Sequence, residues 1–215
     1  MINLPNVTLV AITSIEIEKT IKALQYSCRG INFGEVKLIT DANVSPNGIT
    51  IVKCPRLNSK DEYSKFLVYN LHKHIDTDFS INISYSGFIV NPEKWTDEFL
   101  NYDYVGALWP VGHNFRDKFG RLIRVGNGIA LRSKKLLLLA YDLDLPWEDF
   151  NGCYHEDVWI SVKNRHIYEE NGCKWASVEV AAKFSREKHN PPIPENEGIE
   201  PFLFHGKKDE YLGLI

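Results

Sequence analysis

Apolar and polar positions follow two distinct patterns in the first half of the 215-residue chain. Short apolar runs rich in β-branched residues predict buried strands, and apolar positions that recur every three or four residues predict amphipathic helices. Because strands and helices alternate, we expect an α/β fold in three layers with a mostly parallel central sheet. The predicted strands are 7–12, 36–40, 49–52, 79–85 and 102–108, and the predicted helices are 15–27 and 59–74.

The second half of the chain is less regular. Just before it, Pro92 favours the start of a further helix, whose inner face would carry Trp95, Phe99 and Leu100. The stretch 191–194, Pro-Pro-Ile-Pro, is typical of an exposed extended loop. No repeat, low-complexity tract or clear linker interrupts the sequence, so we expect a single domain over residues 1–215.

The composition of the chain argues against several kinds of binding partner and cysteine site. Hydrophobic residues make up 44% of the chain, charged residues 25%, and the net charge is −3 with a pI of about 6.2. This balance gives no global positive field that would attract nucleic acid or an anionic membrane. The cysteines form no CxxC pair, which indicates reduced structural thiols rather than a zinc site or a disulfide framework. They are Cys28, Cys54, Cys153 and Cys173.

Neither targeting nor membrane insertion is indicated. The amino terminus, MINLPNVTLVAITS, lacks the basic region, long apolar segment and cleavage site of a signal peptide. The longest apolar run is too short to span a bilayer, so we expect no transmembrane segment and a cytoplasmic location. The oligomeric state is left open.

Polar residues follow several of the predicted strands. In an open α/β sheet, ligands gather at the carboxyl ends of the strands, where loops leave a crevice. Such residues are also common turn formers and helix caps, so each alone is weak evidence. The candidates for a binding crevice are Thr13, Ser14, Asp41, Ser84, Tyr85, Ser86 and Gly87.

Ordered blocks along nearly the whole chain carry a resemblance to a known family. They read VTLVAITS, FGEVKLITD, HKHIDTDFSINISYSGFIVNPEKW, FLNYDYVGALW, VGNGIALRSKK, HEDVWIS, AAKFSREKH and FLFHG. With these blocks the chain resembles small bacterial and phage glycosyltransferase-like proteins of GT-A (Rossmann-like) fold, long labelled only as a domain of unknown function. The resemblance implies that residues 1–110 bind a nucleotide-sugar donor, such as a UDP-sugar, and that residues 111–215 bind an acceptor. If a phage encodes the chain, its location would be the host cytoplasm.

The chain departs from the family at one position that bears on metal binding. Where the family pattern has an aspartate that holds Mg²⁺ or Mn²⁺ against the donor diphosphate, this sequence has Ser86, a poor replacement for a carboxylate. A divalent-metal cofactor is therefore in doubt. The segment 76–78 spells Asp-Thr-Asp, but it precedes its strand and should lie at the opposite edge of the sheet, as a capped turn. By resemblance His205 is a metal-ligand candidate; a hydrogen-bonded structural histidine is the alternative.

The block His155-Glu156-Asp157 opens an apolar segment that resembles the start of a helix. By resemblance to inverting GT-A enzymes, Asp157 is the candidate general base that takes the proton of the acceptor hydroxyl, with Glu156 beside it as a second catalytic candidate. The alternative is that these acids only complement the helix dipole and cap free NH groups.

A glycine-rich segment supplies the candidates for a sugar-binding wall. Gly126 and Gly128 would let the backbone pass close to a ligand, and Asn127 tolerates a left-handed conformation or hydrogen-bonds a sugar hydroxyl. By resemblance these residues and Arg132 bind the acceptor or the donor sugar. A plain hairpin turn is the alternative.

Basic residues concentrate between 114 and 135, where seven Lys and Arg face a single acid. They could form a solvated surface, meet the donor diphosphate in place of a metal, or bind an anionic acceptor. We expect a surface saccharide as the acceptor, with a phage hydroxymethylated DNA base as the second choice. Alternatively, the protein binds a nucleotide sugar or acts as a scaffold without catalysing a reaction. Loss of the metal-binding carboxylate is what decay of a catalytic site would produce.

Overall fold

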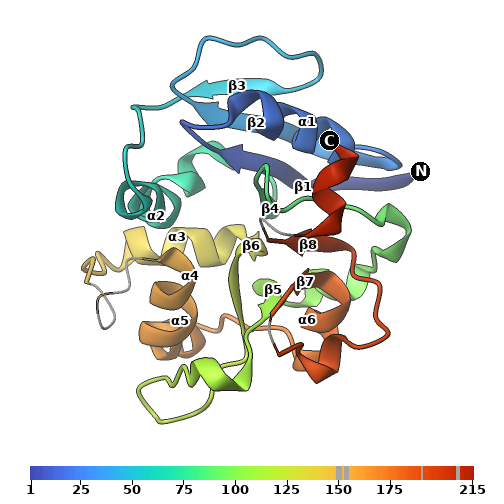
Figure 1. Cartoon of the computed structure of the whole chain (residues 1–215). Helices are drawn as coiled ribbons and strands as arrows, with labels where there is room; N and C mark the ends of the chain where they lie inside the picture. Colours follow the sequence, from blue (N-terminus) through green and yellow to red (C-terminus); the bar gives the residue numbers. More distant parts are fainter. Residues whose placement is uncertain (149–151, 153–154, 190, 207–208) are drawn as a thin grey trace.

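Six strands form one central sheet in the computed structural model, which describes residues 1–148, 152, 155–189, 191–206 and 209–215 (Figure 1). The strand order is β3-β2-β1-β4-β6-β5. β1 pairs in parallel with β2 and β4, and β2 with β3, whereas β6 runs antiparallel to β4 and β5. The expected α/β fold with a mostly parallel sheet is confirmed. The strands are β1 (Ile2–Ile12), β2 (Ile31–Thr40), β3 (Thr50–Lys53), β4 (Phe79–Ile83), β5 (Tyr104–Leu108) and β6 (Val125–Ser133).

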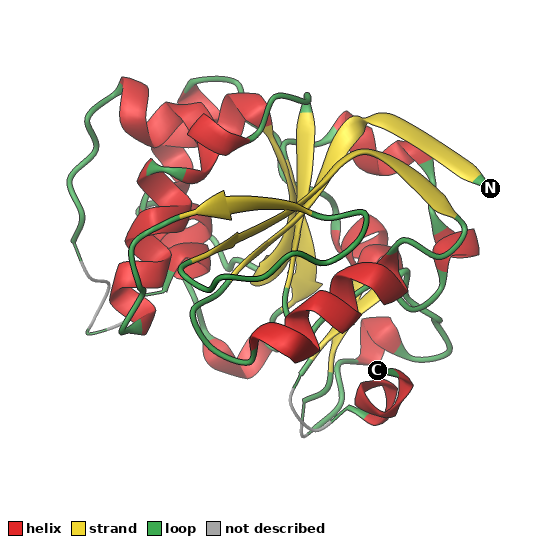
Figure 2. Ribbon diagram, turned by 90° about the horizontal axis from the view of Figure 1, so that it is seen from above, coloured by secondary structure: helices red, strands yellow, loops and turns green. Residues whose placement is uncertain are grey.

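Helices cover both faces of this sheet (Figure 2). α1 and a small parallel sheet of β7 and β8 pack on one face, where Tyr26 of α1 and Phe204 of β8 both contact Phe88 edge-on. α2 lies on the other face with α3 and α4 beside it, and Tyr63 of α2 accepts a hydrogen bond from Asn82 of β4. The helices are α1 (Ile17–Ser27), α2 (Lys60–Tyr69), α3 (Lys134–Asp142), α4 (Glu156–Val158), α5 (Arg165–Glu170) and α6 (Val178–Phe184), and the small sheet is β7 (Ser185–Glu187) and β8 (Leu203–His205).

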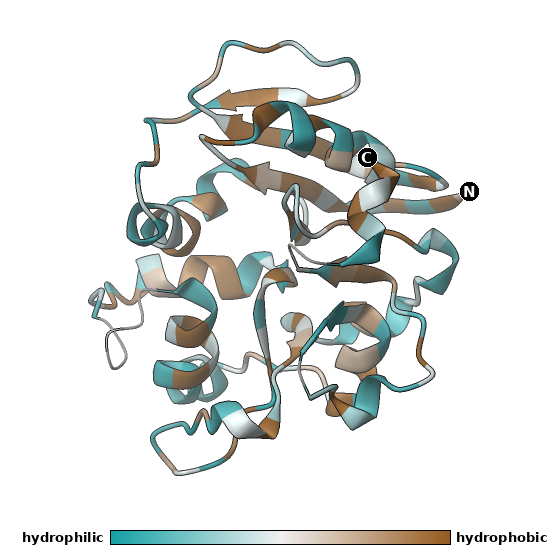
Figure 3. Cartoon of the chain, in the orientation of Figure 1, coloured by the Kyte–Doolittle hydropathy of each residue, from teal (hydrophilic) through white to brown (hydrophobic). Residues whose placement is uncertain are grey.

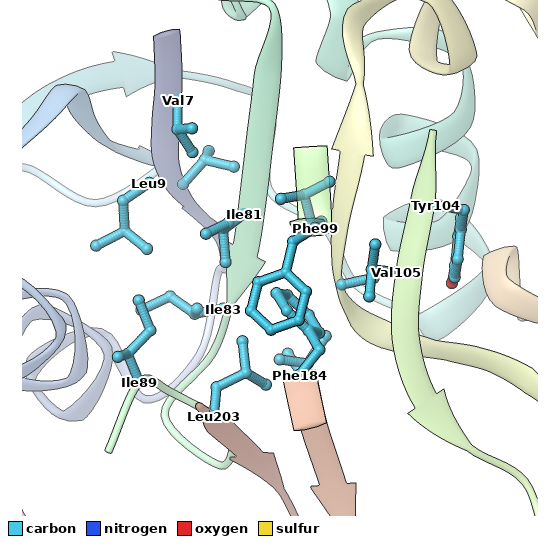
Figure 4. Packing of buried hydrophobic residues seen from close by; sticks show 14 of the residues in the cluster. Val7, Leu9, Ile81, Ile83, Ile89, Phe99, Tyr104, Val105, Phe184 and Leu203 are labelled. Atoms are coloured by element: carbon cyan, nitrogen blue, oxygen red, sulfur yellow. The ribbon is translucent and has the colours of Figure 1, made fainter. Parts of the chain in front are cut away.

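The main core lies between the central sheet and the β7–β8 pair (Figure 4). Alternate residues of the central strands, Val7, Leu9, Ile81 and Ile83, point into it and are at most 1% exposed. Burying each such side chain stabilises the fold by about 1.5–3 kcal/mol. The apolar runs of the sequence therefore form the buried strands. Hydrophilic residues lie on the outer face of α1 (Figure 3).

Three expected segments differ in detail. The predicted helix 59–74 is interrupted at Asn70, so α2 ends at Tyr69 and a separate 3₁₀ turn follows. The segment after Pro92 forms two short 3₁₀ turns instead of one helix. In the stretch predicted as an exposed loop, Ile193 is buried among the core residues, because an apolar side chain there can pack inward from an irregular backbone.

Two sequence expectations concern thiols and membranes. Cys28, Cys54 and Cys173 carry free thiols, and Cys153 lies outside the described residues. In the part of the chain that the structure describes, every helix is too short or too polar to cross a bilayer.

Candidate functional site

The polar loops expected to bind a donor meet at one edge of the sheet. β1, β2 and β4 are parallel, so Thr13, Asp41 and Ser84 follow strands that end at the same edge. Ser14 is buried and its hydroxyl accepts a hydrogen bond from the backbone NH of Leu57 at 2.9 Å, so it ties this loop to the chain ahead of α2. A hydrogen bond from the same hydroxyl lowers the pKa of Asp41. Asp41 is therefore an anion at neutral pH.

The segment after β4 forms a tight turn. Ser84 and Gly87 exchange backbone hydrogen bonds, and the hydroxyls of Ser84 and Ser86 lie 3.2 Å apart. A side chain at Gly87 would come within about 3 Å of Ile129, the carbonyl of Phe204 and the His205 ring. The absence of a side chain thus lets the turn pack directly against β6 and β8. Tyr85 is half-buried on the turn, with the ammonium of Lys19 6.0 Å from its ring centroid.

The glycine-rich segment is part of β6, not a hairpin turn. Because β6 runs antiparallel to β4, its first residues lie at the edge where β4 ends. The β5–β6 register shifts between Gly106 and Leu108, which makes the segment a bulge, and Asn127 adopts the left-handed region with φ of 82°. The glycines leave room for neighbouring side chains: a side chain at Gly126 would strike the ring of Trp109 at 2.0 Å, and one at Gly128 would lie 2.6 Å from a Glu156 oxygen. Their role in sugar binding stays a prediction.

Two residues expected to contact substrates are buried in the structure. Arg132 is fully buried, with its Nη2 3.9 Å from Glu156 Oε1 and 3.2 Å from the carbonyl oxygen of Gly128. Glu156 is 4% exposed and accepts a hydrogen bond from the Ser64 hydroxyl at 3.0 Å. The register places Arg132 opposite Ser80 near the start of β4, away from the loop edge.

Asp157, in contrast, is half-buried at the first turn of α4. Its Oδ1 accepts a hydrogen bond from the NH of Val158 at 2.8 Å. Desolvation, followed by the negative charge of Glu156, raises the pKa of Asp157 to about 7, against the lowering effects of that NH and of Arg132. A carboxylate with such a pKa can accept a proton from a hydroxyl near neutral pH and release it again.

A second acid with a raised pKa was missed by the sequence reasoning. Glu187, the last residue of β7, accepts a hydrogen bond from the Asn127 side chain at 2.6 Å. Its Oε1 lies 3.7 Å from Nδ1 of His205, the residue with which it is paired in the β7–β8 register. Desolvation raises the pKa of Glu187 to about 7, and its charge is one of the influences on Asp157. The only sequence signal was its place in the block AAKFSREKH, to which no role was attached.

Four of the seven cations in the basic run pair with acids. Arg121 contacts Asp117 and Glu169 at 2.6 and 2.5 Å, which neutralises it within the protein. Lys134 follows β6 and bonds backbone carbonyls ahead of β4, at the opposite edge of the sheet. Arg124, Lys135 and Arg132 pair with Glu195, Asp103 and Glu156. These contacts hold the five cations against other parts of the protein.

The segment 76–78 lies ahead of β4, at the edge opposite to the polar loops, as expected. Asp76 Oδ2 is 3.3 Å from the ammonium of Lys37, and the Thr77 hydroxyl donates a hydrogen bond to the carbonyl of Phe79 at 2.7 Å. These contacts give the segment a structural role in the turn that leads into β4.

The residues at the crevice do not fit a Mg²⁺ or Mn²⁺ ion held by the protein alone. Ser86 is 5% exposed, and its neutral hydroxyl faces that of Ser84. His205 and Glu187 supply one nitrogen and one carboxylate, whereas these ions prefer several oxygen ligands. Within the described ranges, no three His, Cys, Asp or Glu side chains are grouped so as to hold a metal ion.

Comparison with known proteins identifies the family. The family model described as "Protein of unknown function (DUF5672)" matches residues 49–205. The chain belongs to this family. The DUF5672 description names no activity, and no curated protein matches the chain.

Solved structures establish the fold of this DUF5672 member. A glycosyltransferase involved in the glycosylation of the major capsid of PBCV-1 is similar with a TM-score of 0.56 and 12% identity, over 97% of this chain and 99% of that one. The galactosyltransferase LgtC, solved with donor and acceptor sugar analogues, gives a TM-score of 0.50 and 10% identity, over 93% and 87%. At these identities the likeness shows the GT-A type of fold and nothing finer.

Proposed function

We propose that this protein is a glycosyltransferase that moves a sugar from a nucleotide-sugar donor to a hydroxyl group of an acceptor. The observation that carries the proposal is the half-buried Asp157, whose pKa of about 7 suits a general base, in a chain with the fold of glycosyltransferases. The loops with Thr13, Asp41 and Ser84 lie at one sheet edge, as a donor site requires in an open α/β sheet.

In the proposed reaction Asp157 accepts the proton of the acceptor hydroxyl while that oxygen bonds to the anomeric carbon of the donor. The bond from this carbon to the diphosphate oxygen breaks, and its electron pair goes to the leaving diphosphate. Attack from the face opposite to the leaving group inverts the configuration at the anomeric carbon. Glu156, Arg132 and Ser64 hold the start of α4 from behind.

A saccharide is the acceptor that the surface supports best. A cavity of about 510 Å³ adjoins the site on the side of β7, and its lining includes Glu187, His189, Ile193 and Asn196. Polar groups beside an apolar wall suit a sugar ring, and the volume lies in the usual range for small-molecule sites. DNA is the weaker choice because four of the seven cations of the basic run are already paired with acids.

The test is sugar transfer by wild type and by Asp157→Asn, after a thermal-shift screen of nucleotide sugars with Mn²⁺ or EDTA has found the donor. We expect the variant to bind the donor nearly as well as wild type but to lose at least about 100-fold in turnover, the usual share of a general base. Asp142→Asn, an exposed position at the end of α3, is the matched control. Full turnover by Asp157→Asn would refute the assignment of the base.

A non-catalytic nucleotide-sugar-binding protein is the second candidate, and the neutral Ser86 is the observation that favours it. It predicts that the donor raises the melting temperature while neither transfer nor donor hydrolysis occurs with any nucleotide sugar that binds. Turnover that Asp157→Asn abolishes would exclude it.

A further inference from the structure

A second cavity, of about 250 Å³, is lined by three arginines. Arg121 and Arg124 come from the segment ahead of β6, and Arg165 is the first residue of α5. Among the described residues that line this cavity there is no carboxylate, and none of the residues proposed above to bind donor or acceptor or to act as the base lines it. The other lining residues are Leu122, Ile123, Val125, Ala176, Ser177 and Val178.

Acidic residues outside the cavity hold two of the guanidinium groups in place. Glu169 bridges them, because its Oε1 accepts a hydrogen bond from Arg165 Nε at 2.7 Å and its Oε2 accepts one from Arg121 Nη2 at 2.5 Å. Arg121 Nε also donates to Oδ2 of Asp117 at 2.6 Å. Neither acid lines the cavity, so these contacts fix two long side chains from outside it.

Each of the three guanidinium groups keeps further NH donors. Arg124 donates through Nε to the carbonyl of Trp109 at 2.8 Å and through Nη1 to Glu195 Oε1 at 2.9 Å. Within the described part of the chain, no protein acceptor receives a hydrogen bond from Nη1 of Arg121, Nη2 of Arg124 or either Nη of Arg165. Since a guanidinium carries five NH donors, several of them remain for a ligand in the cavity.

Arg165 carries a positive charge that the protein compensates only in part. Its guanidinium carbon lies 4.5 Å from the ring centroid of Trp175, so one face of the group is covered by an aromatic side chain. Desolvation lowers the pKa of Arg165, and this effect outweighs the attraction of Glu169. An anion in the cavity would add the charge compensation that Arg165 lacks.

We propose that this cavity binds a small molecule through an oxyanion group, a carboxylate or a phosphate, held by Arg121, Arg124 and Arg165. Guanidinium groups match both anions in geometry and can donate two parallel hydrogen bonds to either. The buried side chains of Ile123 and Ala176 give the cavity an apolar wall against which the body of the molecule would lie. The volume is below the roughly 300–1,000 Å³ of sites for drug-sized ligands, which favours a single charged unit such as an acidic sugar or a sugar phosphate.

The test is a titration of isotope-labelled protein with inorganic phosphate, glucuronate and glucose, followed by NMR. Glucuronate and glucose share a sugar ring and differ in the carboxylate, so glucose measures any binding of the ring alone. The backbone NH signals of residues 121–125 and 176–178 report on the cavity. The variants are Arg121→Gln, Arg124→Gln and Arg165→Gln, and urea unfolding checks that each is folded. Arg116→Gln is the matched control, because this exposed arginine donates to Asn114 and Gly120 and does not line the cavity.

We expect saturable shifts of these signals with phosphate or glucuronate and none with glucose. Each cavity variant should weaken binding of the anion by about tenfold, the usual share of a charge-assisted hydrogen bond, while Arg116→Gln should leave it unchanged. Tighter binding of glucuronate than of phosphate would identify an acidic sugar as the ligand, and the reverse order a phosphate group.

Three results would overturn the proposal: no saturable shift with either anion, equal binding of glucose, or an equal loss of affinity in Arg116→Gln. If Arg165→Gln does not fold, the exposed Arg121→Gln and the half-buried Arg124→Gln decide the question. The titration requires no sugar transfer, so its outcome is separate from that of Asp157→Asn.

Discussion

Replacing Asp157 with asparagine should stabilise the folded protein at alkaline pH while it removes the proposed base. In the folded state the pKa of Asp157 rises from 3.8 to about 7, mainly through desolvation. Between these values the folded protein keeps a proton that the unfolded chain releases, so stability falls as the pH rises through this window. This decrease in the free energy of unfolding is complete above about pH 7, where the Asp157 carboxylate is ionised in the folded state in spite of its desolvation. Asparagine keeps the acceptor for the Val158 NH and carries no charge.

The size of the effect follows from the shift. Three pKa units at about 1.4 kcal/mol each set a ceiling of about 4 kcal/mol. Asp157 is only half-buried and water screens part of this cost, so we expect a gain of about 1–2 kcal/mol at pH 8. For a chain of this size that corresponds to a rise of roughly 2–8 °C in melting temperature. At pH 4 the gain should vanish, because the carboxyl is then neutral in the folded state.

Urea unfolding of wild type, Asp157→Asn and the control Asp142→Asn at pH 4, 6 and 8 measures this directly. The expected signature is a stabilisation by Asp157→Asn that grows with pH, and no pH trend for Asp142→Asn. An equal effect at all three pH values, or a loss of stability at pH 8, would show that Asp157 does not occupy the desolvated position described above.

Three further outcomes follow from the same geometry. The pH profile of kcat/KM should fall on the acid side with an apparent pKa near 7, because Asp157 must be ionised to accept a proton; a profile flat down to pH 5 would contradict this. Gly128→Ala should lower stability by about 1–3 kcal/mol and reduce turnover, since its new side chain would press on Glu156 at 2.6 Å, whereas Gly112→Ala, with open space around it, should be neutral in urea unfolding. Ser64→Ala should cost about 1–3 kcal/mol, because Glu156 loses a buried hydrogen bond; an unchanged urea midpoint would exclude that contact.

The sequence predicts the parallel half of the molecule well, for a physical reason. Strands that are buried on both faces have continuous apolar sequences, so they can be recognised from the sequence. The rule that ligands bind at the carboxyl ends of parallel strands requires only the direction of each strand. The sequence cannot show that β6 is inserted antiparallel between β4 and β5, because the apolar pattern of a strand gives neither its direction nor its neighbours in the sheet. The sequence also does not show that the glycines of this segment make room for Trp109 and Glu156. The sequence does not single out Glu187, because a strand of three residues is too short to show an alternation of apolar and polar positions.

The buried charges behind Asp157 are better explained by the site than by stability. A pair as deeply buried as Arg132 and Glu156 gains little net free energy, because desolvation offsets the attraction between the charges. Its geometry, however, places the charge of Glu156 beside Asp157, where its raising influence on the pKa of Asp157 exceeds the lowering influence of Arg132. The Arg132 guanidinium lies 3.9 Å from the buried Glu156 carboxyl, and Glu156 in turn raises the pKa of Asp157.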